Sequence, residues 1–353
     1  MKNSKILSTL ILGSSILLFT ACEKSSDTFK EDAVINVPAK KESSDAQILS
    51  THWNGDASIG SSIWKTTNID GSGTITTPSD SKYGTIWKFY KPAGSHRTES
   101  HAAAGFTASE GDDIYIGWHS KLDMPANIQS NAVFQWKAYS YNPAVEPMTQ
   151  NYPIVFKTTS AGNLDLMHFA PGKIGTVVWS IPLSRNTWND FVLRLKVSRN
   201  GTVGFMEFWY NGVKQDLTGG TQRYYARTLD ADFCDPKWGA YGADATTITN
   251  YVSGLRIASS YREAAHQVTL YQNVNYGGWN ASLSIGDYTS AQLVALGFTN
   301  DDASSIRVPV GLKATIYENN NFGGTSAVVT SDNSNLGTIS FNDKISSVKI
   351  TYN

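Results

Sequence analysis

The stretch NAVFQWKAYSYN, residues 131–142, alternates apolar and polar side chains and predicts a β-strand. Successive side chains of a strand point to opposite faces of the sheet. Phe134, Trp136 and Ala138 therefore form an ordinary core face. The other face is chemically too specific to serve only as a surface in water. It is a row of an amide, an ammonium group and two phenols: Gln135, Lys137, Tyr139 and Tyr141.

Similar alternating runs fill the chain from about residue 45 to 262, where helical periodicity is almost absent. They include GTIWKFY (84–90), NDFVLRLKVS (189–198) and GFMEFWYNG (204–212). Strands at this spacing, separated by turn residues, predict an all-β sandwich or jelly roll. The Asn-Gly pair at 211–212 predicts a tight hairpin turn.

Net charge and cysteine content exclude two classes of protein. The formal net charge of the 353 residues is −1, which gives no case for nucleic-acid binding. An acidic ligand would therefore have to be held by local cations. The two cysteines, Cys22 and Cys234, cannot form a disulfide framework, and Cys234 is predicted to be a small buried residue.

The first residues predict a compartment. MKNSKILSTLILGSSILLFTAC has two lysines, an apolar run and small residues before Cys22, which indicates a signal peptide at 1–21 rather than a membrane span. Its end, LFTAC, resembles the lipobox of bacterial lipoproteins, in which the cysteine carries the lipid. The alternative is a simple cleaved signal with a coincidental cysteine. Residues 22–46 are polar and charged and are predicted to be a flexible tether between the membrane anchor and the folded protein.

The C-terminal segment, residues 266–353, contains a duplication. LYQNVNYGGWNASLSI (270–285) and IYENNNFGGTSAVVTS (316–331) share a tyrosine, four residues, an aromatic residue and Gly-Gly. Each is followed by a second shared element, TNDDASSIRV (299–308) or FNDKISSVKI (341–350). A period of about 45 residues indicates a duplicated supersecondary unit, and its short strands and turns are consistent with two Greek keys.

These motifs resemble the βγ-crystallin domain, whose microbial members bind calcium through the Asn-Asp-x-x-Ser-Ser element. The resemblance implies structural Ca²⁺ sites that are completed by the hairpin of the other repeat, and Ca²⁺ prefers such oxygen ligands. Asp302 would add a carboxylate to the first site, whereas Lys344 would weaken the second. The alternative is that these residues form Asx and Ser turns without metal. The implied metal-site residues are Asn300, Asp301, Asp302, Ser304, Asn342, Asp343 and Ser346, with Gln272 and Glu318 nearby.

The central segment lacks the motifs of several hydrolases. No strand carries the alternating Glu and Asp pair that a retaining glycosidase on such a sheet would need. The Gly-x-Ser-x-Gly of a serine hydrolase is also absent. The polar face instead combines cations with phenols.

Five motifs in this order resemble the jelly-roll polysaccharide lyases: HRTESH (96–101), FQWK (134–137), the run from Trp188 to Val197, FWYNG (208–212) and KWGAY (237–241). The heparin-lyase-I and glucuronan-lyase group is the most similar, and alginate and ulvan lyases are structural cousins. The resemblance implies a concanavalin-like β-jelly roll over residues 47–263. It also implies β-elimination of an anionic, uronate-containing glycan (glucuronan, ulvan, alginate or a heparin-like chain) by a monomer that needs no cofactor for catalysis. A polymer substrate favours the outer membrane or cell surface.

β-Elimination at a uronate has three requirements: its carboxylate is neutralised, the C5 proton is removed, and the leaving oxygen is protonated. Gln135 and Lys137 on one strand face would supply the neutralising group and either a cation or the base. The family pattern Lys-x-x-x-Tyr places the catalytic tyrosine at Tyr241 and a lysine at Lys237 on the same face. Gly239 between them is expected to leave room for the sugar.

The strand in HRTESH resembles the Arg-Ser/Thr-Glu-x-Arg strand of alginate lyases. Arg97, Glu99 and His101 are expected to share a face. Arg97 would grip a carboxylate while Glu99 orients it, or the two would form a structural ion pair. The remaining predicted substrate contacts are His96, Tyr139 and Tyr141.

The chain departs from the family at the base. Relatives have Gln-x-His where this chain has Gln-Trp-Lys, so Lys137 replaces the histidine, His101 or His96 reaches in, or Tyr241 acts as both base and acid. We favour Tyr241 as the acid with Lys137 or a histidine as the base. The arginine that often follows the tyrosine is missing, which leaves the substrate open. Two other functions remain: a non-catalytic glycan-binding lipoprotein and a glycoside hydrolase.

Overall fold

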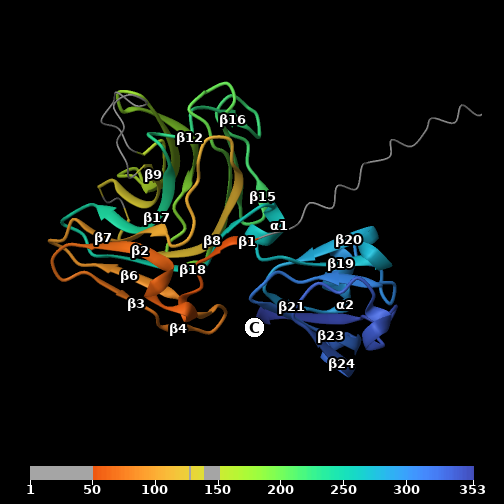
Figure 1. Cartoon of the computed structure of the whole chain (residues 1–353). Coiled ribbons are helices and arrows are strands. Elements are labelled where there is room, and N and C mark those ends of the chain that lie inside the picture. The colour runs from red at the N-terminus through yellow and green to blue at the C-terminus, as the bar shows by residue number, and fades with distance from the viewer. Residues whose placement is uncertain (1–50, 127–128, 139–151) are drawn as a thin grey trace, which may run out of the picture. The chain divides into compact units, whose positions relative to one another are not determined.

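The computed structural model describes residues 51–126, 129–138 and 152–353. The regular secondary structure of this part of the chain consists almost entirely of strands, which confirms the all-β prediction (Figure 1). The predicted signal peptide, Cys22, the tether, Tyr139 and Tyr141 lie outside the described residues and stay predictions.

The first sheet of the central region contains nine strands among the described residues, in the order β15-β14-β13-β8-β18-β6-β3, with β1 paired to β18 and β16 to β14. Every pairing in it is antiparallel. The bounds are β1 (Thr51–Asn54), β3 (Thr74–Thr76), β6 (Trp87–Lys91), β8 (Asp113–Asp123), β13 (Asn189–Lys196), β14 (Phe205–Tyr210), β15 (Val213–Lys214), β16 (Tyr224–Tyr225) and β18 (Ile248–Ala258).

The second sheet contains seven strands within the described ranges, in the order β12-β11-β10-β9-β17-β7-β2, and it is also antiparallel. Strands that neighbour in space come from distant parts of the sequence, as in a jelly roll. The bounds are β2 (Trp64–Ile69), β7 (Arg97–Ala103), β9 (Asn131–Ala138), β10 (Ile154–Thr158), β11 (Asn163–Ala170), β12 (Ile174–Pro182) and β17 (Cys234–Gly242); a small separate hairpin joins β4 (Ser79–Asp80) to β5 (Gly84–Thr85).

Aromatic side chains from the inner faces of both sheets form the core between them. Trp118 of β8 stacks on Phe134 of β9 with ring centroids 4.8 Å apart, and Trp136 and Trp238 are fully buried in the same cluster. Such pairs are worth about 1 kcal/mol each beyond their buried area. Cys234 is also buried in this core, as predicted. The core therefore uses the apolar half of each alternating strand and leaves the polar half on the outer faces.

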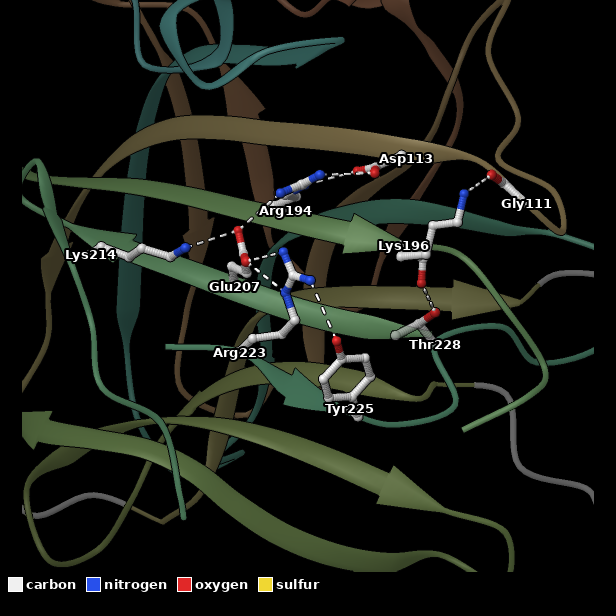
Figure 2. Close-up of polar contacts among 9 residues, drawn as sticks. All are labelled: Gly111, Asp113, Arg194, Lys196, Glu207, Lys214, Arg223, Tyr225 and Thr228. Atoms are coloured by element: carbon white, nitrogen blue, oxygen red, sulfur yellow. Dashed lines mark hydrogen bonds and ion pairs between the residues drawn. The ribbon is translucent and has the colours of Figure 1, made fainter. Parts of the chain in front are cut away.

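The outer face of the first sheet carries a charged cluster (Figure 2). The carboxylate of Glu207, which is 3% exposed, accepts hydrogen bonds or ion pairs from Arg194, Lys214 and Arg223 at 2.7–3.2 Å. Burial raises the pKa of Glu207, but the hydrogen bonds from Arg223 and Lys214 and the charges of Lys214 and Arg194 together lower this pKa below its usual value. Arg194 also holds Asp113. Each cation of this cluster is thus paired with an acid of the same cluster.

The predicted Asn-Gly turn joins β14 to β15. Tyr210 pairs with Val213, so the connection has two residues, Asn211 and Gly212, with φ of 50° and 79°. Positive φ at both central positions is the requirement of the tight hairpin that Asn-Gly favours. This prediction is confirmed.

The C-terminal region forms two further sheets, of order β20-β19-β22 and β21-β25-β23-β24. Strand β21 of the first repeat pairs with β25 of the second, and Asn333 of the second repeat bridges to Ile306 of the first, so the two Greek keys exchange edges. The bounds are β19 (Val268–Asn273), β20 (Gly277–Leu283), β21 (Gly286–Tyr288), β22 (Ser305–Arg307), β23 (Leu312–Asn319), β24 (Gly323–Val329) and β25 (Ser347–Tyr352).

Both repeats fold the aromatic motif in the same way. Tyr271 and Tyr276 meet edge to face at 5.6 Å, and Tyr317 and Phe322 do so at 5.7 Å. The two short α-helices of the described residues are α1 (Tyr261–Ala264) and α2 (Ser290–Ala295), and 3₁₀ turns lie at Ala57–Ile59, Ser61–Ile63, Val274–Tyr276, Asn320–Phe322 and Leu336–Ile339. None of the helices in the described ranges is long and apolar enough to cross a membrane.

Candidate active site

A groove with a volume of about 440 Å³ runs across the outer face of the second sheet. Its lining comes from five adjacent strands, so the groove crosses the strands and spans roughly 19 Å, at about 4.8 Å per strand spacing. That length suits several residues of a polymer. The lining includes Arg97 (β7), Lys237 and Tyr241 (β17), Gln135 and Lys137 (β9), Val155 and Lys157 (β10) and Phe169 (β11).

Cross-strand register brings the predicted motifs together. Strands β7 and β17 pair without a shift, so His101 lies opposite Lys237, and Arg97 lies opposite Tyr241. Lys237 also lies opposite Gln135 on its other side. Gln135, Lys137, Lys237 and Tyr241 therefore line the same groove.

A buried carboxylate lies under the centre of the groove. Glu99 is 2% exposed; its two oxygens accept a hydrogen bond from Gln135 Nε2 and an ion pair from Lys237 Nζ, each at 2.7 Å. Burial raises the pKa of Glu99, and Lys237 and Gln135 oppose that rise. Because one amide N–H of Gln135 is held by Glu99, its second N–H is available to a ligand. Glu99 thus fixes the orientation of Gln135.

The expected partnership of Arg97 and Glu99 is wrong. Arg97 Nε instead donates to Asp70 Oδ2 at 3.2 Å, and its guanidinium lies 4.8 Å from the centroid of the Tyr241 ring. The reason is that Lys237 lies on β17, the strand next to β7, and its ammonium forms the ion pair with the buried carboxylate of Glu99. Arg97 is consequently placed at the edge of the groove, where it packs on the candidate acid.

Tyr241 lines the groove and packs against aromatic and cationic neighbours. The ring of His96 meets it edge to face at 4.6 Å, and His96 Nδ1 pairs with Asp244 Oδ1 at 2.7 Å. Lys237 Nζ lies 6.0 Å from the Tyr241 ring. His96 therefore has a positioning contact with Tyr241, rather than only the direct sugar contact that was expected.

Gly239 has a different role from the one predicted. A Cβ at this position would meet Thr98 O at 2.2 Å and Glu99 Cα at 2.7 Å, so the space is taken by the backbone of β7 and not by a sugar. Its φ of 147° lies at a register shift between β17 and β9. Only glycine tolerates that conformation and that close approach.

The two candidate bases differ in position and in basicity: Lys137 lines the groove, whereas His101 lies on β7 opposite Lys237. Burial, followed by the charge of Lys237, lowers the pKa of Lys137 to about 8. Burial, followed by the charges of Lys237 and Lys137, lowers the pKa of His101 to about 4. A neutral fraction of Lys137 is therefore present near neutral pH, and it is much the stronger base of the two.

Several residues in the groove and next to it were not found from the sequence. Asp70 and Asp244 position Arg97 and His96. Tyr152, Lys157 and Phe169 line the β10–β11 end of the groove, where Tyr152 meets Phe169 edge to face at 5.2 Å. Val155 and Lys157 of β10 join the groove because β10 pairs with β9, which is a matter of strand order that the sequence of one strand does not reveal.

The predicted metal residues of the C-terminal region form two crossed pairs. Ser346 Oγ donates to Asp301 Oδ1 at 3.0 Å, and Ser304 Oγ donates to Asp343 Oδ1 at 3.2 Å, so each motif contacts the other repeat. Asn300 and Asn342 each bond the aspartate that follows them. Gln272 and Glu318 directly follow Tyr271 and Tyr317, whose carbonyls accept from the backbone N–H groups of Ser304 and Ser346. Carboxylate, hydroxyl and carbonyl oxygens of this kind fit Ca²⁺.

Asp302 contacts Gln272, another of the predicted site residues, and Trp279. Its Oδ2 accepts from Gln272 Nε2 at 3.1 Å and from Trp279 Nε1 at 3.0 Å, which ties it to its own repeat. Across the described residues no group of three or more His, Cys, Asp and Glu side chains could hold a metal ion. Each candidate site therefore offers a single aspartate together with neutral oxygens.

The C-terminal region has βγ-crystallin-like homologues. It is 37% identical over 83 residues to development-specific protein S of Myxococcus xanthus, covering 24% of this chain and 47% of that protein, and 35% identical to a homolog of protein S from the same organism. The chain thus spans about half the length of the curated relatives it matches. A βγ-crystallin domain from Flavobacterium johnsoniae is 48% identical, covering 24% of this chain and 94% of that chain with a TM-score of 0.24. One from Clostridium beijerinckii is 45% identical, covering 24% and 97% with a TM-score of 0.23.

Two family profiles match the chain. The profile of peptidase inhibitor family I36 matches residues 264–329, inside the C-terminal region. The profile described as polysaccharide lyase matches residues 45–256, which is more than half of the chain and contains the whole groove. This protein therefore belongs to the polysaccharide lyase family.

Proposed function

We propose that the groove cleaves a uronate-containing polysaccharide by β-elimination. The observation that carries this proposal is the juxtaposition in one groove of Gln135, Lys137 and Tyr241 above the buried pair of Glu99 and Lys237. This set offers an oriented amide donor, an amine of lowered basicity and a phenol, which are the three groups that the reaction needs.

In the proposed reaction the second N–H of Gln135 binds the uronate carboxylate and stabilises the charge that develops there. The neutral amine of Lys137 takes the C5 proton, and the electron pair forms the C4–C5 double bond as the C4–O4 bond breaks. The Tyr241 hydroxyl gives its proton to O4. Release of a proton to solvent by the Lys137 ammonium and uptake of a proton from solvent by the Tyr241 phenolate then restore both groups.

The unsaturated uronate at the new chain end absorbs ultraviolet light, which provides the test. The purified chain is incubated with a panel of uronate polymers, and both absorbance and reducing ends are followed. We expect the two signals to rise together on at least one polymer. Reducing ends without absorbance would identify a hydrolase, and binding without either product would identify a glycan-binding protein; each result overturns the proposal.

For the C-terminal region we propose structural Ca²⁺ binding at the two crossed pairs. The support is that Asp301 and Asp343 each face a serine of the other repeat, so that an ion at either site would join the two Greek keys. An ion that binds only the folded state stabilises it by about 2.7 kcal/mol at one hundred times its Kd. Such an ion would oppose the separation of the repeats.

Removal of calcium is expected to lower the melting temperature of the C-terminal transition by about 10 °C in the full-length chain. Calorimetry with excess Ca²⁺ and with chelator measures this shift. The double variant Asp301→Asn, Asp343→Asn should lose the response. The matched control is Asp287→Asn, which removes an exposed acid that pairs with Lys349, and it should keep the response. A melting temperature that is equal with ion and with chelator would exclude these sites.

A further inference from the structure

The cations of the groove are not equivalent. Arg97 is paired with Asp70, and Lys237 is paired with Glu99. Lys157 also lines the groove, yet in the described part of the chain it has no hydrogen-bond or ion-pair partner. The acid opposite it on β11, Asp165, accepts a hydrogen bond from Ser180 Oγ at 2.6 Å. The ammonium of Lys157 therefore differs from the charged groups of Arg97 and Lys237, each of which is paired with an acid.

The cluster on the first sheet shows the opposite arrangement (Figure 2). There Arg194, Lys214 and Arg223 converge on Glu207, and Asp113 takes a further share of Arg194. Cations that are paired with buried acids stabilise the sheet, and they attract an anionic ligand only weakly. The cluster around Glu207 is therefore structural, whereas the ammonium of Lys157 can pair with an anionic group of a ligand.

The position of Lys157 relative to Gln135 indicates which sugar of a bound polymer it would face. Gln135 lies opposite Val155, and Lys157 lies two residues further along β10. The Cα atoms of Gln135 and Lys157 are therefore roughly 8 Å apart, from one strand spacing and two residues of rise. The groove crosses the strands, with Arg97 on the β7 side of the centre and Lys157 on the β10 side. Lys157 is thus placed beside a sugar that adjoins the reacting uronate.

The same end of the groove offers an apolar surface. Val155 and the aromatic pair of Tyr152 and Phe169 line it next to Lys157. Apolar and aromatic side chains bind the C–H face of a sugar ring, while a lysine ammonium selects an anionic substituent at its edge. Together these groups form a site for one charged sugar residue.

We propose that Lys157 binds a carboxylate or sulfate on the sugar next to the reacting uronate, so that the substrate class is a glycan acidic at consecutive residues. This inference rests on the proposed function for the identity of the reacting sugar. It excludes as preferred substrates those glycans in which single uronates are separated by neutral sugars.

Binding, rather than cleavage, tests this inference. The full-length chain and Lys157→Met are titrated calorimetrically with three soluble glycans: a homopolymeric uronate, a polymer alternating uronate with a sulfated sugar, and one alternating uronate with a neutral sugar. We expect Lys157→Met to lower the affinity for the first two glycans by about tenfold, as for the loss of one close charge pair. The affinity for the third glycan should not change. Lys157→Arg should retain tighter binding of the acidic polymers than Lys157→Met.

The matched control is Lys88→Met on β6 of the other sheet, which should bind all three glycans as the unaltered chain does. Equal losses on all three glycans, or no loss on any, would overturn the inference. A loss on the uronate homopolymer alone, or on the sulfated polymer alone, would support it and identify the anionic group. If the unaltered chain binds acidic glycans but releases no unsaturated product, the proposed reaction fails while the role of Lys157 is still decided.

Discussion

Replacing Tyr241 with phenylalanine is expected to lower kcat by about 10²–10⁴-fold, the usual contribution of a positioned acid or base. The leaving oxygen would then depart without a proton donor from the protein. Binding should change little, because the ring keeps its contacts with His96 and Arg97 when only the hydroxyl is removed. The expected pattern is therefore a loss of kcat at nearly constant affinity. Initial rates of absorbance increase and calorimetric titration with the same polymer measure the two quantities.

A second tyrosine controls for the loss of a hydroxyl. Tyr225 lies on the outer face of the first sheet, where it contacts Arg223 (Figure 2), and Tyr225→Phe should retain full activity. If Tyr241→Phe also retained full activity, the acid would have to be another group. If it lost binding and folding together, circular dichroism and the melting temperature would show that the ring position, not the hydroxyl, was responsible.

The faces of the site strands could be predicted from the sequence, because alternation is a local property. The core position of Trp136 and the groove position of Gln135 follow from one strand, and those of Trp238 and Tyr241 from another. The Asn-Gly turn at 211–212 was equally local. Each of these predictions needed no knowledge of which strands are neighbours.

The partners of the site residues could not be predicted, because they depend on strand order and register. Glu99 pairs with Lys237 rather than Arg97 only because β7 and β17 are adjacent and in register. Gly239 is required by the backbone of that neighbouring strand, which the sequence of β17 does not reveal. Lys157 joins the groove because β10 pairs with β9. Side-chain alternation is thus encoded within a strand, whereas the pairing of charges is encoded by the whole fold.

The rate of elimination is expected to rise with pH up to about pH 8 and then to level off. Only the neutral form of Lys137 accepts a proton, and burial together with the positive charge of Lys237 lowers the pKa of Lys137 to about 8. Glu99 opposes this shift, while Arg97 adds to it. Below that pKa the neutral fraction falls about tenfold per pH unit, so kcat/KM should fall in proportion. The pH profile of kcat/KM on one polymer measures this dependence.

Two variants test whether Lys137 or His101 is the base. Lys137→Met should lower kcat/KM by about 10²–10⁴-fold and remove the limb near pH 8, whereas His101→Gln should keep that limb. If His101 were the base, its pKa of about 4 would make the profile flat through neutral and alkaline pH, because the imidazole would already be neutral. A flat profile with an active Lys137→Met variant would therefore reject the amine as base. A limb that disappears with Lys137 would show that a lysine has replaced the histidine of the related lyases.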